Sequence, residues 1–415
     1  MKLENIALNI YKSMCPKLFR GILIFIDKIF KTHFLYEEKF ANFTPLDFSS
    51  SKVIMLHGSS VGEIQSLEHL IKQIKNDFAN TKIVLTTSTP TGQELAKKKY
   101  SQLADFITFF PYDIYKVAQD FLNKIKPDVI LIAETELWPN FFICAHDNKI
   151  PLYIINARLS DKSFPNYLKI KNFIKIILNS TAGIFCQSEL DKSRYIELGA
   201  EKNKVEVMKN LKFKIEKKPC DIDLKTQGFK TIIAASTHSG EEEIIVRVYK
   251  KLKEKIKNLK LIIAPRHLNR LDEVKKTLVG VNFGFRTRED NFLSKDVIVL
   301  DTLGELSKVY AIVDVAFIGG SFNKTGGHNP LEATVYSKPT ISGSSIKNFR
   351  DIYAILTREN SAFIAKSENE LLKLFEKLLT DENYYNAISN NCEKCFLSQQ
   401  GGVEFVTSKL KEILT

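Results

Sequence analysis

The sequence predicts an α/β protein with two doubly wound domains and an amphipathic helical segment in front of them. Two observations support this fold class. Short apolar runs alternate with helix-length amphipathic stretches along most of the 415 residues, which is typical of parallel strands covered by helices on both faces. The alternation stops once, near the middle of the chain, and then starts again. At roughly 150 residues per domain, the length also fits more than one domain.

Residues 1–49 form the N-terminal amphipathic segment. Apolar side chains recur at three- and four-residue steps from Tyr11 to Ile29, which places them on one face of a helix. Basic residues accompany this face, as in helices that lie in an anionic membrane interface. Docking of the helix on the protein's own core is an equally open alternative. Between Tyr11 and Ile29 the longest uncharged run, residues 21–26, is too short to span a bilayer.

Residues 50–208 and 229–415 are the two expected domains, each Rossmann-like, and residues 209–228 form a Lys-rich linker. The last helix is a candidate for packing back on the first domain. Strands of the first domain are expected at 52–57, 82–87, 105–109, 128–132, 152–156 and 183–187. Strands of the second domain are expected at 231–235, 259–264, 281–285, 297–300, 313–318 and 339–341.

The net charge indicates the kind of partner, and the cysteines indicate the redox environment. The formal net charge is +12, which favours an anionic partner, but no arginine-rich tail or known nucleic-acid motif occurs. The six cysteines are scattered, as expected in a reducing cytosol. Cys392 and Cys395 form a lone CxxC without the second pair that zinc needs. Asp221 and Asp223 lie in the linker, so we expect neither a metal ion nor a cofactor.

Glu63 is the first candidate catalytic residue. It ends the stretch HGSSVGE at 57–63, between the strand at 52–57 and the following helix. Open α/β sheets bind ligands outside the carboxyl ends of their strands, where a carboxylate can act as a general base. The simpler alternative is a solvated Glu in the first turn of a capped helix.

Four loops of the second domain carry polar residues where predicted strands end. The residues are Ser236 and His238, then Pro265 and Arg266, then Gly304, Glu305 and Leu306, and finally Gly327, Asn329, Pro330, Leu331 and Glu332. An Arg at a strand end can bind a phosphate in bidentate fashion, glycines let backbone amides approach a phosphate, and Glu332 can accept two ribose hydroxyls. The alternative for any one loop is a plain turn.

Nine sequence blocks resemble those of 3-deoxy-D-manno-octulosonic acid (Kdo) transferases. The blocks are HGSSVGE at 57–63, TTSTPTGQE at 86–94, AETELWPN at 133–140, INARLS at 155–160, NLKF at 210–213, AASTHSGEEE at 234–243, APRH at 264–267, GEL at 304–306 and GGHNPLE at 326–332. They occur in the family's order across residues 50–350. The resemblance implies a GT-B fold and an inverting transferase that moves Kdo from CMP-Kdo to a lipid A precursor, lipid IVA, in lipopolysaccharide biosynthesis.

The resemblance also implies roles for individual residues. Glu63 matches the general base, and Glu134 and Lys212 match groups that stabilise the transition state. The nucleotide contacts fall on Pro265, Arg266, Gly304, Glu305, Leu306, Asn329, Pro330, Leu331 and Glu332. Ser236, His238 and Gly327 are further candidates for donor phosphate or sugar contacts. The family implies a peripheral or monotopic enzyme at the cytoplasmic face of the inner membrane, with that membrane surface but no nucleic acid as a partner.

Three departures from the family pattern leave alternatives open. Lys209 and Asn210 stand where the family usually has a Gly two residues before its Leu-Lys-Phe block, and residues 342–345 replace a frequent Gly-Pro. Residues 1–49 carry no clear family motif. Another GT-B nucleotide-sugar transferase or an epimerase would share this architecture, while a non-enzymatic protein that binds anionic surfaces is a weaker alternative. The number of Kdo units added and the oligomeric state do not follow from these blocks.

Overall fold

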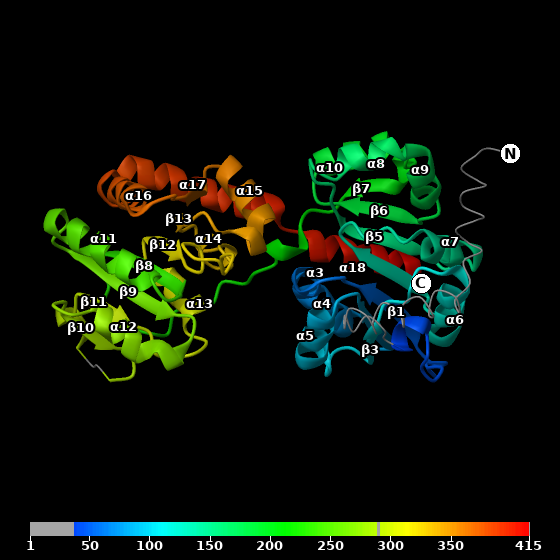
Figure 1. Cartoon of the computed structure of the whole chain (residues 1–415), viewed down its shortest axis with the longest axis horizontal. Helices are drawn as coiled ribbons and strands as arrows, with labels where there is room; N and C mark the ends of the chain where they lie inside the picture. Colours follow the sequence, from blue (N-terminus) through cyan, green and yellow to red (C-terminus); the bar gives the residue numbers. More distant parts are fainter. Residues whose placement is uncertain (1–36, 289–290, 415) are drawn as a thin grey trace, which may run out of the picture. The chain divides into compact units, whose positions relative to one another are not determined.

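The computed structural model describes residues 37–288 and 291–414. The amphipathic helix predicted between Tyr11 and Ile29 lies outside the described residues. The chain divides into two compact units. Unit 1 comprises Met1–Lys214 and Gln400–Thr415, and unit 2 comprises Ile215–Gln399. Each unit has its own seven-stranded parallel sheet with helices packed around it (Figure 1). The predicted α/β fold with two doubly wound sheets is therefore confirmed.

The sheet of unit 1 has the strand order β3-β2-β1-β4-β5-β6-β7. Its strands are β1 (Lys52–His57), β2 (Thr81–Thr87), β3 (Phe106–Phe109), β4 (Val129–Ala133), β5 (Leu152–Ala157), β6 (Gly183–Cys186) and β7 (Val205–Val207). Its helices are η1 (Glu37–Phe40), α3 (Val61–Ser66), α4 (Glu68–Asp77), α5 (Pro90–Tyr100), α6 (Tyr115–Ile125), α7 (Pro139–Asp147), α8 (Phe164–Lys169), α9 (Lys171–Asn179), α10 (Glu189–Glu197), η2 (Lys202–Lys204), η3 (Leu211–Phe213) and α18 (Gly402–Leu414).

The order of strands in unit 1 reverses between β1 and β4. These strands pair in parallel, with His57 beside Ile132, so the loops that follow them leave the same edge of the sheet. Every residue of β4 is buried, as expected for a central strand covered on both faces. The reversal is the topological switch point at which open α/β sheets bind their ligands.

The sheet of unit 2 has the strand order β10-β11-β9-β8-β12-β13-β14, with its reversal between β8 and β12. Its strands are β8 (Lys230–Thr237), β9 (Leu259–Pro265), β10 (Phe283–Phe285), β11 (Val297–Val299), β12 (Val315–Ile318), β13 (Thr340–Ser342) and β14 (Ala362–Ile364). Its helices are α11 (Glu241–Lys255), η4 (Leu268–Arg270), α12 (Leu271–Thr277), η5 (Phe292–Ser294), α13 (Leu306–Val309), η6 (Tyr310–Ile312), α14 (Leu331–Thr334), η7 (Lys347–Phe349), α15 (Arg350–Arg358), α16 (Glu368–Thr380) and α17 (Glu382–Gln399).

The last helix, α18, packs in unit 1. Its side chains Val403, Val406 and Leu410 are buried in the same cluster as Leu70 and Ile71 of α4. The expected linker, residues 209–228, is divided between the units. Leu211 and Phe213 are buried in unit 1, whereas Ile222 and Leu224 are buried in unit 2. Within the described part of the chain, no helix is both long enough and apolar enough to cross a membrane.

Candidate active site

Glu63 lies at the switch point of unit 1, in the first turn of α3. The backbone N–H of Ser59 donates a hydrogen bond to its Oε2 at 2.5 Å, and the Ser60 hydroxyl donates to its Oε1 at 3.3 Å. The loop after β1 therefore folds back on the carboxylate that follows it. The side chain is half-buried, unlike the solvated Glu of the simpler alternative.

The surroundings of Glu63 weaken its acidity. Burial, followed by the nearby carboxylates of Glu134 and Glu136, raises its pKa to about 7, against the opposing hydrogen bonds from Ser59 and Ser60. A carboxyl group with a pKa near neutrality is matched to proton transfer at physiological pH, because it is ionised in a large fraction of molecules and still basic. The unit 1 site therefore contains a carboxylate suited to the role of general base.

The loop that carries Glu63 is fixed by the loop after β2. The Ser59 carbonyl accepts hydrogen bonds from the backbone N–H groups of Ser88 and Thr89 at 3.2 and 3.1 Å, and from the Thr89 hydroxyl at 3.1 Å. Thr89 also caps α5, since its hydroxyl accepts from the Gly92 N–H. A Cβ on Gly92 would lie 3.3 Å from the Ser59 carbonyl oxygen, so the glycine permits this close approach.

Glu134 and Lys212 form an ion pair in unit 1, with Lys212 Nζ 3.0 Å from Glu134 Oε1 and side-chain exposures of 24% and 17%. Glu134 follows β4 directly and has a φ of 60°, an uncommon conformation for a non-glycine residue. Its backbone N–H donates to the Ile155 carbonyl at 2.9 Å. The structure thus brings together the three residues Glu63, Glu134 and Lys212.

Lys212 is positioned by a network of buried amides. Asn210 Oδ1 accepts from the Lys212 N–H at 2.9 Å, while Asn210 Nδ2 donates to Gln187 Oε1 at 3.0 Å. The preceding residue, Lys209, has a φ of 76°. A left-handed backbone favours glycine, the residue that the family resemblance led us to expect at this position. Lys209 adopts this conformation at the cost of backbone strain.

In unit 2, Glu241 joins the loops that follow the switch-point strands β8 and β12. Its carboxylate is 1% exposed and accepts the backbone N–H groups of Gly320, Ser321 and Phe322 at 2.7, 2.8 and 2.9 Å. It also accepts the His238 N–H at 2.9 Å. Since the Gly327 N–H donates to the Gly320 carbonyl at 2.7 Å, these amides are engaged within the protein. These five N–H groups are therefore not free to bind a phosphate.

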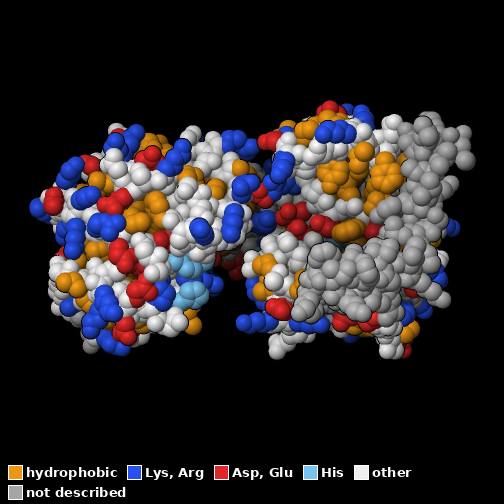
Figure 2. Space-filling view, viewed as in Figure 1, with side chains coloured by type: hydrophobic (Ala, Val, Ile, Leu, Met, Phe, Trp, Pro, Cys, Tyr) orange, Lys and Arg blue, Asp and Glu red, His pale blue; other side chains and the backbone are white. Residues whose placement is uncertain are grey.

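Histidines and arginines gather at this edge of unit 2. His238 Nε2 and His328 Nε2 lie 2.8 Å apart, and the His267 ring packs edge-on to His238 at 5.6 Å. These are the histidines of unit 2 in the sequence, and they appear in Figure 2 as a pale-blue patch on the surface of that unit. Burial lowers the pKa of His328 to about 4, with smaller contributions from His238 and Arg266. Burial also lowers the pKa of His238, so both rings favour the neutral form.

Arg266 is exposed and directly follows β9, whose last residue is the buried Pro265. Its charge acts on Glu332 in α14: burial raises the pKa of Glu332, and Arg266 opposes this rise. Asn329 Oδ1 accepts the Leu331 N–H at 3.1 Å, which fixes the turn at Pro330. The loop that carries Arg266 and the loop from Asn329 to Glu332 therefore belong to the same part of unit 2.

Residues 304–306 lie at the start of α13. Gly304 has a φ of 86°, which a residue with a side chain rarely adopts. Glu305 accepts a hydrogen bond from the Thr302 hydroxyl and pairs with Arg286 at 3.4 Å, and Leu306 is the first residue of α13. The part of this loop in donor binding stays a prediction.

The comparisons with known proteins match both units. A family model described as 3-deoxy-D-manno-octulosonic-acid transferase (kdotransferase) matches residues 35–215, and a model described as glycosyl transferases group 1 matches residues 229–394. The 3-deoxy-D-manno-octulosonic acid transferase of Haemophilus influenzae is 33% identical over 373 residues, which cover 87% of each chain. This chain belongs to the Kdo transferase family. It is a glycosyltransferase.

Two further similarities concern length and fold. A Fusobacterium nucleatum protein described as a bifunctional glycosyltransferase/methyltransferase is 35% identical, and the match covers 94% of this chain. The match spans 60% of the length of that protein. The solved UDP-GlcNAc 2-epimerase from Neisseria meningitidis, bound to UDP-GlcNAc, is 16% identical with a TM-score of 0.56, and the match covers 87% of this chain and 100% of that one. The latter similarity supports the two-domain GT-B fold.

Two residues of this Kdo transferase family member were missed as site candidates. Glu136 lies beside Glu63 and was hidden in AETELWPN, where only the first carboxylate was assigned a role. Glu241 was quoted only within the block AASTHSGEEE and was given no role, but its side chain binds residues 320–322, the glycine loop after β12. The signal for Glu241 was a run of three Glu residues at 241–243 after a strand. Nothing in the sequence distinguishes Glu241 and Glu242, which are both 1% exposed, from the half-buried Glu243.

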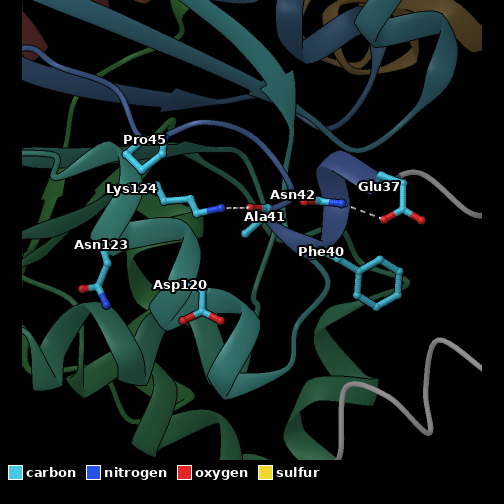
Figure 3. A pocket seen from close by; sticks show the side chains of 8 residues that line it. All are labelled: Glu37, Phe40, Ala41, Asn42, Pro45, Asp120, Asn123 and Lys124. Carbon is cyan, nitrogen blue, oxygen red and sulfur yellow. Dashed lines mark hydrogen bonds between the residues drawn. The ribbon is translucent and has the colours of Figure 1, made fainter.

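Two cavities among the described residues contain none of the predicted site residues. One, of about 480 Å³, lies between η1 and α6 in unit 1 (Figure 3). Lys124 Nζ donates there to the Ala41 carbonyl at 2.7 Å, and Asn42 Nδ2 donates to Glu37 Oε2 at 3.1 Å. The other, of about 650 Å³, lies in unit 2 around Asp221 and Asp314. Within the described ranges, no group of three or more His, Cys, Asp or Glu side chains is arranged to hold a metal ion.

The pKa of Glu63 predicts how activity depends on pH. A general base must be ionised, and below a pKa of about 7 most Glu63 carboxyls carry a proton. We therefore expect kcat/KM for Kdo transfer to rise with pH through about 7 and to level off above it. The measurement is the initial rate at low substrate concentration between pH 5 and pH 9. A flat profile below pH 7 would contradict this assignment.

Proposed function

We propose that this protein transfers Kdo from CMP-Kdo to a lipid A precursor (lipid IVA) with inversion at the anomeric carbon. The observation that carries the proposal is the state of Glu63. This carboxylate is held by the Ser59 N–H at 2.5 Å, lies at a sheet switch point, and has a pKa raised to about 7. Membership of the Kdo transferase family supports the choice of Kdo as the transferred sugar.

The proposed reaction is a single displacement. Glu63 removes the proton from a sugar hydroxyl of the acceptor while that oxygen attacks the anomeric carbon of Kdo. The bond between this carbon and the phosphate oxygen breaks, and CMP leaves with the electron pair. Because the attacking and leaving oxygens lie on opposite faces of the carbon, its configuration inverts. General base catalysis of this kind contributes about 10²- to 10⁴-fold.

The remaining site residues supply positive charge, near the base and at the donor phosphate. Lys212, paired with Glu134 at 3.0 Å, supplies a fixed positive charge close to the base. Arg266, with the loop from Asn329 to Glu332, is proposed to bind the cytidylate, and its guanidinium matches a phosphate better than an ammonium group does. Negative charge that develops on the departing phosphate is stabilised by such preorganised groups.

The acceptor and the location follow from the proposed activity. The lipid A precursor is an acylated, phosphorylated disaccharide of the cytoplasmic membrane face, and a net charge of +12 favours an anionic surface of this kind. We propose a peripheral or monotopic association there.

Acceptor-dependent release of CMP tests the proposed function. Purified protein is incubated with CMP-Kdo, with and without lipid IVA, and CMP is quantified by chromatography. Release that requires the lipid is expected. If UDP-GlcNAc is turned over and CMP-Kdo is not, an epimerase or a different GT-B transferase replaces the proposal. Salt-sensitive binding to random DNA that CMP does not affect would instead favour a non-enzymatic binding protein.

Arg266→Lys is expected to raise the KM for CMP-Kdo about tenfold, because the loss of one charge-assisted hydrogen bond costs roughly 1.4 kcal/mol. The KM for the lipid acceptor should stay unchanged. The measurement is the initial rate over a series of CMP-Kdo concentrations. Arg247→Lys is the matched control, since Arg247 lies on α11 and pairs with Glu368 at 2.8 Å. Equal donor titration curves for wild type and Arg266→Lys would remove Arg266 from the donor site.

A further inference from the structure

Glu136 lies next to the proposed base in unit 1, and the reaction step described above gives it no part. Its Oε2 accepts a hydrogen bond at 3.0 Å from Nε1 of Trp138, two residues later in the sequence. This bond holds the Glu136 carboxylate in place. The side chain is half-buried. Its charge acts directly on Glu63 and contributes to the raised pKa of that residue. Glu136 is thus a second anchored carboxylate beside the base.

The charged and titratable groups around Glu136 come from several elements. Burial raises the pKa of Glu136 and Glu134 adds to the rise, whereas hydrogen bonding from Trp138 and from the Ser59 side chain opposes it. Tyr167 of α8 also responds to the Glu136 charge, which raises the pKa of its hydroxyl after the larger effect of burial. Lys212 is already paired with Glu134.

Ser59 connects Glu136 with the base. Its backbone N–H holds Glu63 Oε2 at 2.5 Å, its side chain interacts with Glu136, and its carbonyl is held by Ser88 and Thr89. Ser59 therefore contacts both carboxylates and is itself held by the loop after β2. The Trp138 ring, which donates the hydrogen bond to Glu136, packs near Phe110, with ring centroids 5.8 Å apart.

We propose that Glu136, anchored by Trp138 and linked through Ser59, is a positioning residue that keeps the Glu63 carboxylate in place for removal of the acceptor proton. The inference rests on the proposed function of Glu63. A negative charge beside a carboxylate disfavours its ionised form and so increases its affinity for a proton. The acceptor hydroxyl therefore meets a stronger base than an isolated Glu would be.

Glu136→Gln tests the inference, because it removes the charge and keeps an oxygen that accepts the Trp138 N–H. The acidic limb of the kcat/KM profile is expected to move down by about half a pH unit or more. The kcat above pH 8 should fall several-fold, and the KM for CMP-Kdo should stay the same. Glu136→Asp keeps the charge and should leave the limb near its wild-type position. Thermal unfolding of each variant checks that it is folded.

Two further variants keep the test decisive. Glu68→Gln is the matched control: Glu68 lies on α4 of the same unit and pairs with Lys72 at 2.7 Å, so its limb should not move. Trp138→Phe removes the N–H that stabilises ionised Glu136 and must shift the limb in the same direction as Glu136→Gln, should the latter fail to fold. An unmoved limb in both variants overturns the inference. If Glu63→Gln itself keeps the wild-type rate, the proposed function fails instead, so the two failures are distinguishable.

Discussion

Replacing Glu63 by Gln is expected to lower kcat for Kdo transfer by about 10²- to 10⁴-fold, the range that general base catalysis supplies. Gln has nearly the same shape as Glu and its amide oxygen can still accept the Ser59 N–H, which holds Glu63 Oε2 at 2.5 Å. It cannot take a proton from the acceptor. The measurement is the single-turnover rate with saturating CMP-Kdo and lipid acceptor.

Two controls separate chemistry from folding and binding in Glu63→Gln. Loss of a partly buried charge should leave the thermal midpoint equal to or slightly above that of the wild type, because burial disfavours the ionised group. CMP affinity, measured by calorimetry, should be unchanged, since the proposed nucleotide contacts lie in unit 2. The rate of this variant should also lose the rise through pH 7 expected for the wild type.

Replacing Glu241 by Ala is expected to destabilise the protein by about 3 kcal/mol or more. The side chain is 1% exposed and accepts four backbone N–H groups, those of His238, Gly320, Ser321 and Phe322. Each buried donor left without a partner costs about 1–3 kcal/mol. Water that enters the vacated space recovers part of this cost, which is why the expected total is well below the sum.

Urea unfolding of the full chain, followed by far-UV circular dichroism, measures this effect. Glu254→Ala is the matched control, because Glu254 lies on the same helix, α11, and is exposed. The single Trp of the sequence, Trp138, lies in unit 1, so its fluorescence reports unfolding of that unit separately. An unchanged circular dichroism midpoint for Glu241→Ala would show that the glycine loop does not depend on this carboxylate.

The fold class could be predicted from the sequence because buried parallel strands appear in it as continuous apolar runs. β1 and β9 were predicted almost to the residue, since their runs end abruptly at polar turns. β7 and β14 were missed. Each has three residues, and β7 reads Val-Glu-Val with only Val205 fully buried. Length alone does not explain the misses, because β10 is an edge strand of the same length and was predicted at 281–285. The Val-Glu-Val pattern of β7 is too short and too polar to be separated from a loop.

The site was predictable only in part. The positions of Glu63 and Glu134 follow from strand ends, and the sheet order places those ends side by side. The contacts that determine their chemistry depend on distant segments: Lys212 reaches Glu134 across 78 residues, and Glu241 binds amides about 80 residues away. Local patterns do not contain such contacts. The positive φ of Lys209 is another example, because nothing about Lys predicts it.

The most direct test of the central claim is the mass of the lipid product. Purified protein is incubated with CMP-Kdo and lipid IVA at pH 8, and the lipid is analysed by mass spectrometry beside a Glu63→Gln sample. We expect the wild-type product to be heavier by one or more whole Kdo units, and the Glu63→Gln lipid to remain unmodified over the same time. A Glu63→Gln sample that yields the same heavier lipid at a comparable rate would contradict the account.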